Sequence, residues 1–495
     1  METSIESIRE QLEALEVKMT AAVNDHQSLI QSIHPEQRDS ARNLLHYLVL
    51  RSEDIRSLQE ALHIAGLSSL ASAESHIHSQ VQSVLQRLGK KYHPEDKEIC
   101  DFAFSSQKIS SNSQQLFGEK KSKQTPYIMV TFDRSFADNY AFIKSLLQNG
   151  MNVARINCAH DDEATWSGMI NQVKKASRQT GIGCKIYMDL AGPKIRTRIL
   201  SKGHKKGQVK ITKGQMVWLA EDAADFGEED IVISPGEKGI IKKLKKGDRV
   251  YIDDGKVKGV VEKIKNNAAG IRLIRTQEKG KIKEAKGINF PDTKLEIPSL
   301  TEYDKQCLPF ICENADMVGY SFLRSKADLE QLQDLLLKLS PTPTHLIMKI
   351  ETPEAVSNLP ALLYQGMRFP VAGVMIARGD LAVEIGFERM GEIQDEILWI
   401  CEAAHMPVVW ATQVLESLNK SGLATRSEIT DAAHAAKAEC VMINKGEHTV
   451  EVIETLNDLL GRMGSHRIKK RYIFRPLNIA RDFLSKKKQA ELETV

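Results

Sequence analysis

Eight short apolar runs, separated by segments with helical periodicity, constrain the fold of this chain more than any other feature. The runs span 127–132, 152–157, 185–190, 317–322, 345–350, 373–378, 407–412 and 440–445. Each is almost continuously apolar, as expected of parallel strands buried on both faces, and stretches such as ADLEQLQDLLLKL separate most of them. Eight strand–helix units are the number that closes a (β/α)8 barrel. The sequence therefore predicts an α/β fold built on a TIM barrel.

The segment before the first run differs in texture. Residues 1–118 repeat apolar side chains at spacings of three and four, which predicts a helical N-terminal domain suited to docking or dimerisation; examples are Ile5, Ile8, Leu12, Leu15 and Met19. The polar Ser/Gln-rich stretch 105–124, which overlaps the end of this domain, is interpreted as a linker.

A second departure lies between the third and fourth runs. Residues 197–290 are rich in Lys, Gly, Val and Ile, and their alternation and turn dipeptides predict a small inserted all-β domain. The barrel would then comprise 119–196 and 291–465, and a basic tail would span 466–495.

Composition limits the function classes. The 495 residues are 42% hydrophobic and 27% charged, and the net charge of +3 is too small to argue for nucleic acid or a membrane surface. Seven scattered cysteines without CxxC spacing indicate free thiols in a reducing compartment. The N-terminus carries acids and no apolar signal core, and no apolar run approaches the roughly 18 residues that span a bilayer. These features predict a cytoplasmic enzyme.

Polar residues gather at the ends of the predicted strands, where the active sites of such barrels lie. They are Asn157, Asp189, Ser321, Lys349 with Glu351, Asp380 and Thr412. Glu351 and Asp380 follow neighbouring strands and could share one hard divalent cation through oxygen ligands. Arg155, Arg196 and Lys349 would supply positive charge to an anionic substrate, as phosphoryl transfer requires. A structural ion-pair network could explain any one of these residues, but not the whole set.

Nine motifs in this order carry a family resemblance: NVARINCAH, YMDLAGPKIRT, YIDDG, KGINFP, MKIETPEAV, VMIARGDLAVEIG, VVWATQVLES, ATRSEITDAAHA and CVMINKGE. Together, over about 125–465, they resemble the pyruvate kinase family. The resemblance implies a barrel with a β lid domain. It also implies transfer of a phosphoryl group from phosphoenolpyruvate to ADP, with Mg²⁺ or Mn²⁺ as cofactor.

The resemblance assigns roles to the chemistry-bearing residues. Glu351 and Asp380 match the ligands of the catalytic divalent metal. Lys349 matches the lysine that stabilises the phosphoryl group in flight, and Arg155 the arginine that grips the phosphates. Thr412 matches the hydroxyl near the enolate carbon, on the route that protonates enolpyruvate.

The resemblance also implies a set of substrate contacts: Asn157, His160, Arg196, Ser321, Gly379, Asp380 and the lid residue Asp254. Gly379 and Asp380 would open a helix, where backbone N–H groups suit the substrate carboxylate. Asp254 matches an acid that moves in when the site closes. Arg196 matches a phosphate contact at the junction of barrel and lid.

Three linked substitutions depart from the family pattern. In many relatives a potassium ion is held by an Asn, a Ser, an Asp and a Thr, with a glutamate nearby. Here the Ser position is Ala159, the Thr position is Leu190 and the glutamate position is Lys194. A fixed ammonium can supply the same single positive charge, so the sequence predicts a potassium-independent site. The alternative is that Lys194 merely pairs with Asp189.

Other departures leave the reaction partly open. The first strand runs into Asp133-Arg134 where relatives have Gly-Pro beside the nucleotide, and Met348, Ala285 and the segment 444–447 also differ. One alternative is another metal-dependent enolpyruvate or 2-oxo acid enzyme that binds no nucleotide. Another is a regulatory or scaffold homologue that recruits a protein partner, or a second copy, through residues 1–118.

Relatives also carry a C-terminal domain with an allosteric sugar-phosphate site. Only about thirty residues of this sequence follow Gly464. We therefore expect activation through such a domain to be missing.

Overall fold

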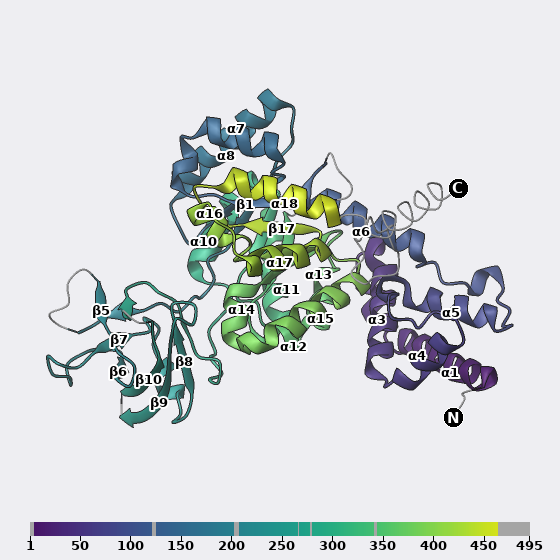
Figure 1. Cartoon of the computed structure of the whole chain (residues 1–495), viewed down its shortest axis with the longest axis horizontal. Helices are drawn as coiled ribbons and strands as arrows, with labels where there is room; N and C mark the ends of the chain where they lie inside the picture. The colour runs from purple at the N-terminus through teal and green to yellow at the C-terminus, as the bar shows by residue number, and fades with distance from the viewer. Residues whose placement is uncertain are drawn as a thin grey trace, which may run out of the picture.

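Eight parallel strands close into a barrel at the centre of the molecule, which confirms the predicted fold (Figure 1). The structure is a computed structural model that describes residues 4–120, 125–201, 207–265, 267–277, 280–340 and 344–463. Around the barrel the order is β1-β17-β16-β15-β14-β13-β3-β2. The strands are β1 (Tyr127–Thr131), β2 (Val153–Asn157), β3 (Lys185–Asp189), β13 (Met317–Tyr320), β14 (His345–Ile350), β15 (Ala372–Ala377), β16 (Val408–Ala411) and β17 (Cys440–Ile443).

The strands are apolar throughout because both of their faces are covered. Every residue of β1 and β15 is buried. Alternate residues join two different clusters: Met129 packs with Val153 and Met375, whereas the adjacent Val130 packs with the residues beneath the surrounding helices. This two-sided burial explains the continuous apolar runs in the sequence.

Helices surround the barrel between the strands. They are α7 (Tyr140–Asn149), α8 (Glu163–Thr180), α10 (Glu302–Asn314), α11 (Lys326–Leu339), α12 (Pro353–Ser357), α13 (Leu359–Gly366), α14 (Arg378–Ile385), α15 (Met390–Ala403), α16 (Glu416–Ser421), α17 (Arg426–His434) and α18 (Thr449–Met463). Their starts are encoded locally. Capping boxes at Thr301, Ser325 and Thr425 satisfy the first free N–H groups of α10, α11 and α17.

The chain leaves the barrel after β3 and builds a seven-stranded sheet to one side of it (Figure 1). The sheet runs β12-β8-β9-β10-β6-β7-β4, and β5 pairs separately with β11. The strands are β4 (Arg198–Ile199), β5 (Gln208–Lys210), β6 (Met216–Ala220), β7 (Val232–Ser234), β8 (Arg249–Ile252), β9 (Val257–Lys265), β10 (Ala268–Arg275), β11 (Lys281–Lys283) and β12 (Ile288–Asn289), with one short helix, α9 (Ile240–Lys243). This part, called the lid below, has an apolar cluster of its own.

Helices of the N-terminal segment lie on the opposite side of the barrel from the lid (Figure 1). They are α1 (Ile5–Asp25), α2 (Gln27–Gln31), α3 (Arg38–Ser52), α4 (Arg56–Ile64), α5 (Ile77–Arg87) and α6 (Phe102–Phe117). The predicted linker at 105–124 is wrong over most of its described length, because α6 continues to Phe117.

Buried polar contacts explain why the composition of α6 misled the prediction. The hydroxyl of Ser105 donates to the carbonyl of Ser75 at 2.6 Å, and the amide of Asn112 donates to the carbonyl of His405 at 2.9 Å. Leu116 is fully buried among strand residues. Polar side chains of α6 therefore satisfy buried carbonyls of the N-terminal segment and of a barrel loop, instead of marking solvent-exposed chain.

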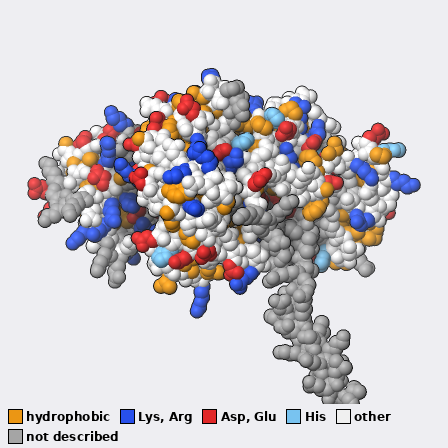
Figure 2. Space-filling model, turned by 90° about the horizontal axis from the view of Figure 1, so that it is seen from above, with side chains coloured by type: hydrophobic (Ala, Val, Ile, Leu, Met, Phe, Trp, Pro, Cys, Tyr) orange, Lys and Arg blue, Asp and Glu red, His pale blue; other side chains and the backbone are white. Residues whose placement is uncertain are grey.

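The surface carries charges of both signs. On the face shown in Figure 2, basic and acidic side chains are interspersed, in keeping with the small net charge. Among the helices of the described ranges, none is both long and apolar enough to span a bilayer. The predicted basic tail at 466–495 lies outside the described residues.

Candidate active site

Asp189, at the end of β3, is the fully buried centre of an ion-pair cluster in the barrel mouth. Arg155 donates to its Oδ2 from Nη2 at 2.6 Å and from Nε at 3.1 Å, and Lys349 Nζ lies 3.2 Å from the same oxygen. The hydroxyl of Tyr187 donates to Oδ1 at 2.8 Å. Burial opposes ionisation, but the charges of Lys349 and Arg155 outweigh it and lower the pKa of Asp189. The carboxylate is therefore ionised and fixes both cations.

Lys349 extends from β14 and joins three oxygen atoms. Its Nζ lies 2.7 Å from Glu351 Oε1 and donates to Ser321 Oγ at 2.7 Å, besides contacting Asp189. The second oxygen of Glu351 accepts the backbone N–H of Phe322 at 2.8 Å. Phe322 has φ +55°, a left-handed turn that aims this N–H into the site. Lys349 is thus held in one position by groups from three strand ends.

Lys194 pairs with Asp380. Its Nζ lies 2.8 Å from Oδ1 and 3.1 Å from Oδ2, so the alternative pairing with Asp189 is not formed. Burial lowers the pKa of Lys194, but the charges of Asp380, Asp254 and Glu351 raise it above its usual value. The amine is therefore ionised and lies within the field of three carboxylates.

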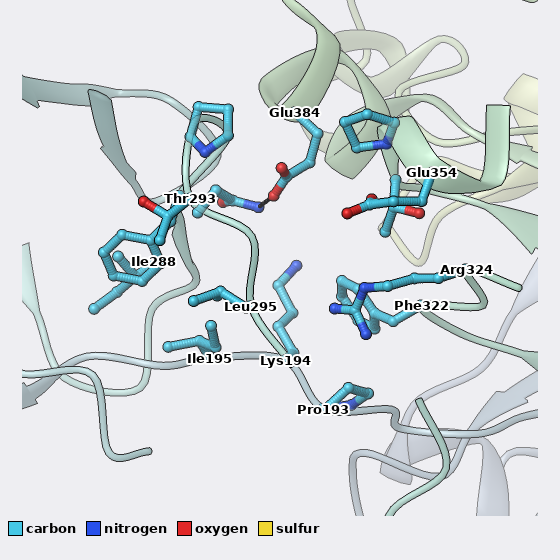
Figure 3. A pocket seen from close by; sticks show the side chains of 15 residues that line it. Pro193, Lys194, Ile195, Ile288, Thr293, Leu295, Phe322, Arg324, Glu354 and Glu384 are labelled. Carbon is cyan, nitrogen blue, oxygen red and sulfur yellow. Dashed lines mark hydrogen bonds between the residues drawn. The ribbon is translucent and has the colours of Figure 1, made fainter. Parts of the chain in front are cut away.

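The lysine stem has room because of a glycine. A Cβ at position 287 would lie 2.9 Å from Lys194 Cε, closer than real contacts allow. In Figure 3 the Lys194 side chain points into a pocket lined from both the lid and the barrel. Gly287, within the KGINFP motif, thus leaves space for the Lys194 side chain.

Glu351 and Asp380 are the two acids that could hold a hard divalent cation. Burial raises the pKa of Glu351, and the charge of Asp380 raises it further, so the two acids repel each other across the site. Each currently bonds a lysine, yet a carboxylate oxygen accepts more than one partner. Two carboxylates completed by substrate oxygens are a common way to hold Mg²⁺.

A hydrogen bond joins Thr412 to the backbone of Gly379. Thr412 follows β16 with φ +67°, and its Oγ1 accepts the backbone N–H of Gly379 at 2.8 Å. That N–H, which the sequence assigned to the substrate carboxylate, is engaged by Thr412 in this structure.

Arg378, the first residue of α14, lies at the barrel mouth and was not among the residues that the sequence singled out. It donates to the carbonyls of Ala411 at 3.0 Å and Thr412 at 2.6 Å, and its Nη1 lies 2.5 Å from Asp431 Oδ1. Its guanidinium lies over the Trp410 ring, 4.5 Å from the centroid. The available signal was its place beside Gly379 in the ARGD motif.

The remaining predicted contacts lie around the rim of the mouth. Burial lowers the pKa of His160, and the positive charges of nearby Lys445 and Arg196 lower it further. The rim is therefore positive through Lys445 and Arg196, while His160 favours its neutral form. The side chain of Arg196 donates to the carbonyl of Ala285 at 3.1 Å. Asn157 Oδ1 accepts the backbone N–H two residues on, at 3.0 Å.

Two departures from the family pattern lie close together. Lys445 Nζ, after β17, is 3.9 Å from Asp133 Oδ2, after β1. β1 and β17 are neighbours in the barrel, so their C-terminal loops meet. The substitutions at these two positions therefore form one ion pair.

Glu384 links the barrel to the lid. It accepts the side-chain amide of Asn289 at 2.7 Å (Figure 3). Burial, with a further contribution from the charge of Asp380, raises the pKa of Glu384 to about 7.

The raised pKa of Glu384 predicts a pH-dependent stability. Between about pH 4.5 and 7 the folded chain holds a proton that the unfolded chain has released, so the free energy of unfolding falls as pH rises through this window. Above pH 7 the folded state bears the full cost of ionising Glu384, up to about 3 kcal/mol. We expect Glu384→Gln to raise the thermal unfolding midpoint at pH 8 and to change it little at pH 5. Glu388→Gln, on an exposed neighbour, is the control, and an equal effect of Glu384→Gln at both pH values would refute this explanation.

The closed barrel, the lid and the charged residues at the barrel mouth define an α/β barrel protein with an inserted β domain. Residues 124–451 match the family model described as pyruvate kinase, barrel domain. The chain belongs to the pyruvate kinase family.

Curated pyruvate kinases are about 30% identical to this chain over the aligned residues. The chain is 29% identical to a pyruvate kinase of Staphylococcus saprophyticus over 330 residues, covering 65% of this chain and 54% of that protein. It is 33% identical to a cytosolic pyruvate kinase isozyme of Glycine max over 305 residues, covering 61% of this chain and 58% of that protein. The chain spans about half the length of the curated relatives it matches.

Proposed function

We propose that this protein transfers the phosphoryl group of phosphoenolpyruvate to a nucleoside diphosphate, giving pyruvate and, from ADP, ATP. The observation that carries the proposal is the position of Lys349, bonded to Glu351 and Ser321 and paired with Asp189 in the barrel mouth. A lysine buried at such a cost serves best where it meets developing negative charge. Phosphoryl transfer creates that charge on the group in flight.

Each residue of the site has its own role in the proposed reaction. Arg155 binds the phosphate oxygens, and Lys349 stabilises the phosphoryl group as its bond to the enol oxygen breaks and its bond to the nucleotide forms. Glu351 and Asp380 would hold Mg²⁺ or Mn²⁺, which when bound neutralises charge on the substrate oxygens. Thr412 lies on the route by which the enolate carbon receives its proton, leaving pyruvate.

Substrate contacts complete the proposal. Asn157, His160, Arg196 and Ser321 would contact the substrate, and Gly379 its carboxylate once Thr412 releases the N–H. Asp254, whose charge already reaches Lys194, would move toward the substrate as the lid closes.

We propose further that the reaction needs no potassium. The positive charge of Lys194 lies against Asp380 in the site. Leu190 is buried and offers no side-chain oxygen where many relatives have a potassium ligand. The tethered amine would therefore take the place of the free ion.

A coupled assay tests the function. Purified protein with phosphoenolpyruvate, Mg²⁺ and each common nucleoside diphosphate should release pyruvate in tetramethylammonium buffer, and added K⁺ should leave the rate unchanged. Absence of pyruvate with every nucleotide would count against the transfer reaction. A strict need for K⁺ would count only against the role of Lys194.

The Asp133–Lys445 pair favours a second candidate. It lies at the strand ends where relatives bind the nucleotide, and it could exclude ADP. The chain would then be another metal-dependent enolpyruvate or 2-oxo acid enzyme. Calorimetry with ADP and Mg²⁺ separates the two, since only the transfer reaction requires nucleotide affinity.

The helical segment before the barrel supports a partner proposal. We infer that residues 1–118 provide an interface for a second copy or another protein, in a reducing cytoplasmic setting in which the seven cysteines stay free thiols. Sedimentation of the full chain would reveal self-association. If cells that carry a catalytically inactive variant behaved like cells that carry the wild type, a scaffold function would be favoured instead.

A further inference from the structure

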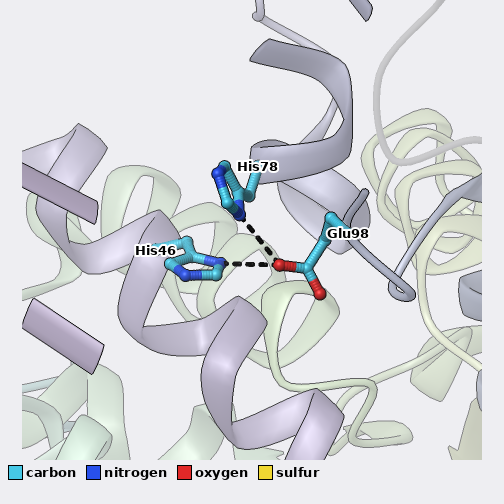
Figure 4. A group of neighbouring side chains, drawn as sticks. All are labelled: His46, His78 and Glu98. Carbon is cyan, nitrogen blue, oxygen red and sulfur yellow. Dashed lines mark hydrogen bonds and ion pairs between the residues drawn. The ribbon is translucent and has the colours of Figure 1, made fainter. Parts of the chain in front are cut away.

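Two histidines and a glutamate meet inside the N-terminal helices, far along the chain from the active-site motifs. They are His46 on α3, His78 on α5 and Glu98, which follows the short helix η3 (Pro94–Asp96). One ligand atom from each residue lies within 4.8 Å of the other two, and Figure 4 shows both imidazole rings turned toward the carboxylate. The histidines are 3% and 8% exposed.

The separations around Glu98 suit a metal ion. His78 Nδ1 lies 2.8 Å from Glu98 Oε2, and His46 Nδ1 lies 4.0 Å from the same oxygen. A tetrahedral ion with bonds of about 2.0–2.1 Å separates its ligand atoms by about 3.4 Å. The two distances lie on either side of that value, so small side-chain movements would bring all three atoms to an ion.

His46 Nδ1 has no hydrogen-bond partner among the described residues, although it is buried. A buried polar nitrogen left unpaired costs on the order of 1–3 kcal/mol. Its distance of 4.0 Å from Glu98 is too long for a hydrogen bond. An ion between the two would satisfy both atoms at once.

Glu16 lies on the side of His78 where metal-binding histidines usually have an outer partner. His78 Nε2 lies 3.6 Å from Glu16 Oε1, on the side of the ring away from Glu98. Lys90 at 2.7 Å and the hydroxyl of Tyr92 at 2.9 Å fix the other oxygen of Glu16. The separation between His78 Nε2 and Glu16 is longer than a hydrogen bond, and Nε2 has no hydrogen-bond partner among the described residues. The negative charge of Glu16 still favours a proton on Nε2, which leaves the Nδ1 lone pair free to bind a cation.

We propose that His46, His78 and Glu98 bind a Zn²⁺ ion that ties α3 and α5 to the chain after η3. Two imidazoles and one carboxylate are ligands that zinc prefers, with water completing the coordination. The ion takes the place of the proton between His78 and Glu98. Because Asn43 of α3 also donates to the carbonyl of Ala403 at 2.8 Å, the site steadies the helices that contact the barrel.

An ion-pair network without metal is the competing explanation. Burial lowers the pKa of His78, but its interactions with Glu16 and Glu98 outweigh burial and raise it to about 9. A protonated His78 between two acids accounts for those three groups. It leaves the buried Nδ1 of His46 without a partner among the residues that the structure describes, whereas an ion would pair that nitrogen with Glu98.

Zinc binding by the untagged full chain tests the proposal. Protein stripped with a chelator is titrated with Zn²⁺ against a competing chelator, in excess Mg²⁺, and Co²⁺ absorption reports tetrahedral ligands. We expect one tightly bound ion and a higher thermal unfolding midpoint when it binds. Glu16→Gln should weaken binding about 10–100-fold, and His46→Ala or Glu98→Gln should weaken it more.

Two controls keep the result interpretable. His63→Ala, on an exposed histidine of α4, should bind Zn²⁺ like the wild type. Asp380→Asn should also bind normally, which separates this site from the barrel mouth. Equal Zn²⁺ affinity in wild type and His46→Ala, or loss of binding in Asp380→Asn alone, would overturn the proposal. If a variant fails to fold, a wild-type chain with no stoichiometric Zn²⁺ would overturn it too.

Discussion

Lys349→Met should reduce the rate of pyruvate formation by roughly 1000-fold, the upper range for removing one preorganised charge-stabilising group. The physical reason is position: the amine is fixed by Asp189, Glu351 and Ser321, so no water or mobile cation can replace it without reorganisation. The turnover number should carry the loss, because the charge it meets develops only in the transition state. Steady-state kinetics in Mg²⁺ buffer measures this.

The same substitution also threatens the fold, so the experiment needs a partner variant. Removing one member of a buried ion pair costs about 3–5 kcal/mol, although Arg155 still pairs with Asp189. Lys349→Arg keeps the charge and should fold while remaining strongly impaired. Lys338→Met, on an exposed lysine of α11, should behave like wild type. A folded Lys349→Met protein with near-normal turnover would remove Lys349 from the mechanism.

Lys194→Glu should reduce activity about 100-fold or more. It replaces the amine that lies 2.8 Å from Asp380 with a third acid beside Asp380 and Glu351. Two like charges about 4 Å apart repel by about 4 kcal/mol at an effective dielectric constant of 20, and each 1.4 kcal/mol corresponds to about tenfold in rate. Initial rates in tetramethylammonium and in potassium buffer give the comparison.

Potassium should not rescue the single variant, because Ala159 and Leu190 offer no side-chain oxygen. The triple variant Ala159→Ser, Leu190→Thr, Lys194→Glu should regain activity in K⁺ and not in tetramethylammonium. Lys238→Glu, which changes charge by the same amount on an exposed lid lysine, serves as the control. Unchanged activity of Lys194→Glu in potassium-free buffer would exclude the amine as a substitute for the ion.

The barrel could be predicted because each strand is buried on both faces, and this burial is visible in the sequence of the strand itself. Residues such as Met129 and Val130 face different clusters, both apolar, so burial on two faces leaves a continuous apolar run in the sequence. Helix α6 was not predictable by the same reasoning. Its Asn112 is buried against the carbonyl of His405, a partner 293 positions away, and no local pattern reveals such a contact.

In the site, too, some features could be predicted from local sequence and others depend on contacts between distant residues. Strand-end position and motifs pointed to Glu351, Asp380 and Lys349 as candidates, and the structure places each of them in an ion pair at the barrel mouth. The partner of Lys194 could not be chosen between acids from the sequence, because Asp189 is nearer in the chain while Asp380 is nearer in space. Arg378 escaped notice because two of its contacts are to backbone carbonyls, which every residue carries, and its acidic partner Asp431 is 53 positions away.

Binding of Mn²⁺ measures the central claim, that Glu351 and Asp380 hold a divalent cation beside a tethered ammonium. Electron paramagnetic resonance of Mn²⁺ with phosphoenolpyruvate and the full chain in potassium-free buffer should reveal one bound ion. Glu351→Gln or Asp380→Asn should weaken that binding by at least about tenfold, since even outer partners of metal ligands contribute 10–100-fold. Mn²⁺ affinity that is the same in wild type and in both variants would contradict the account.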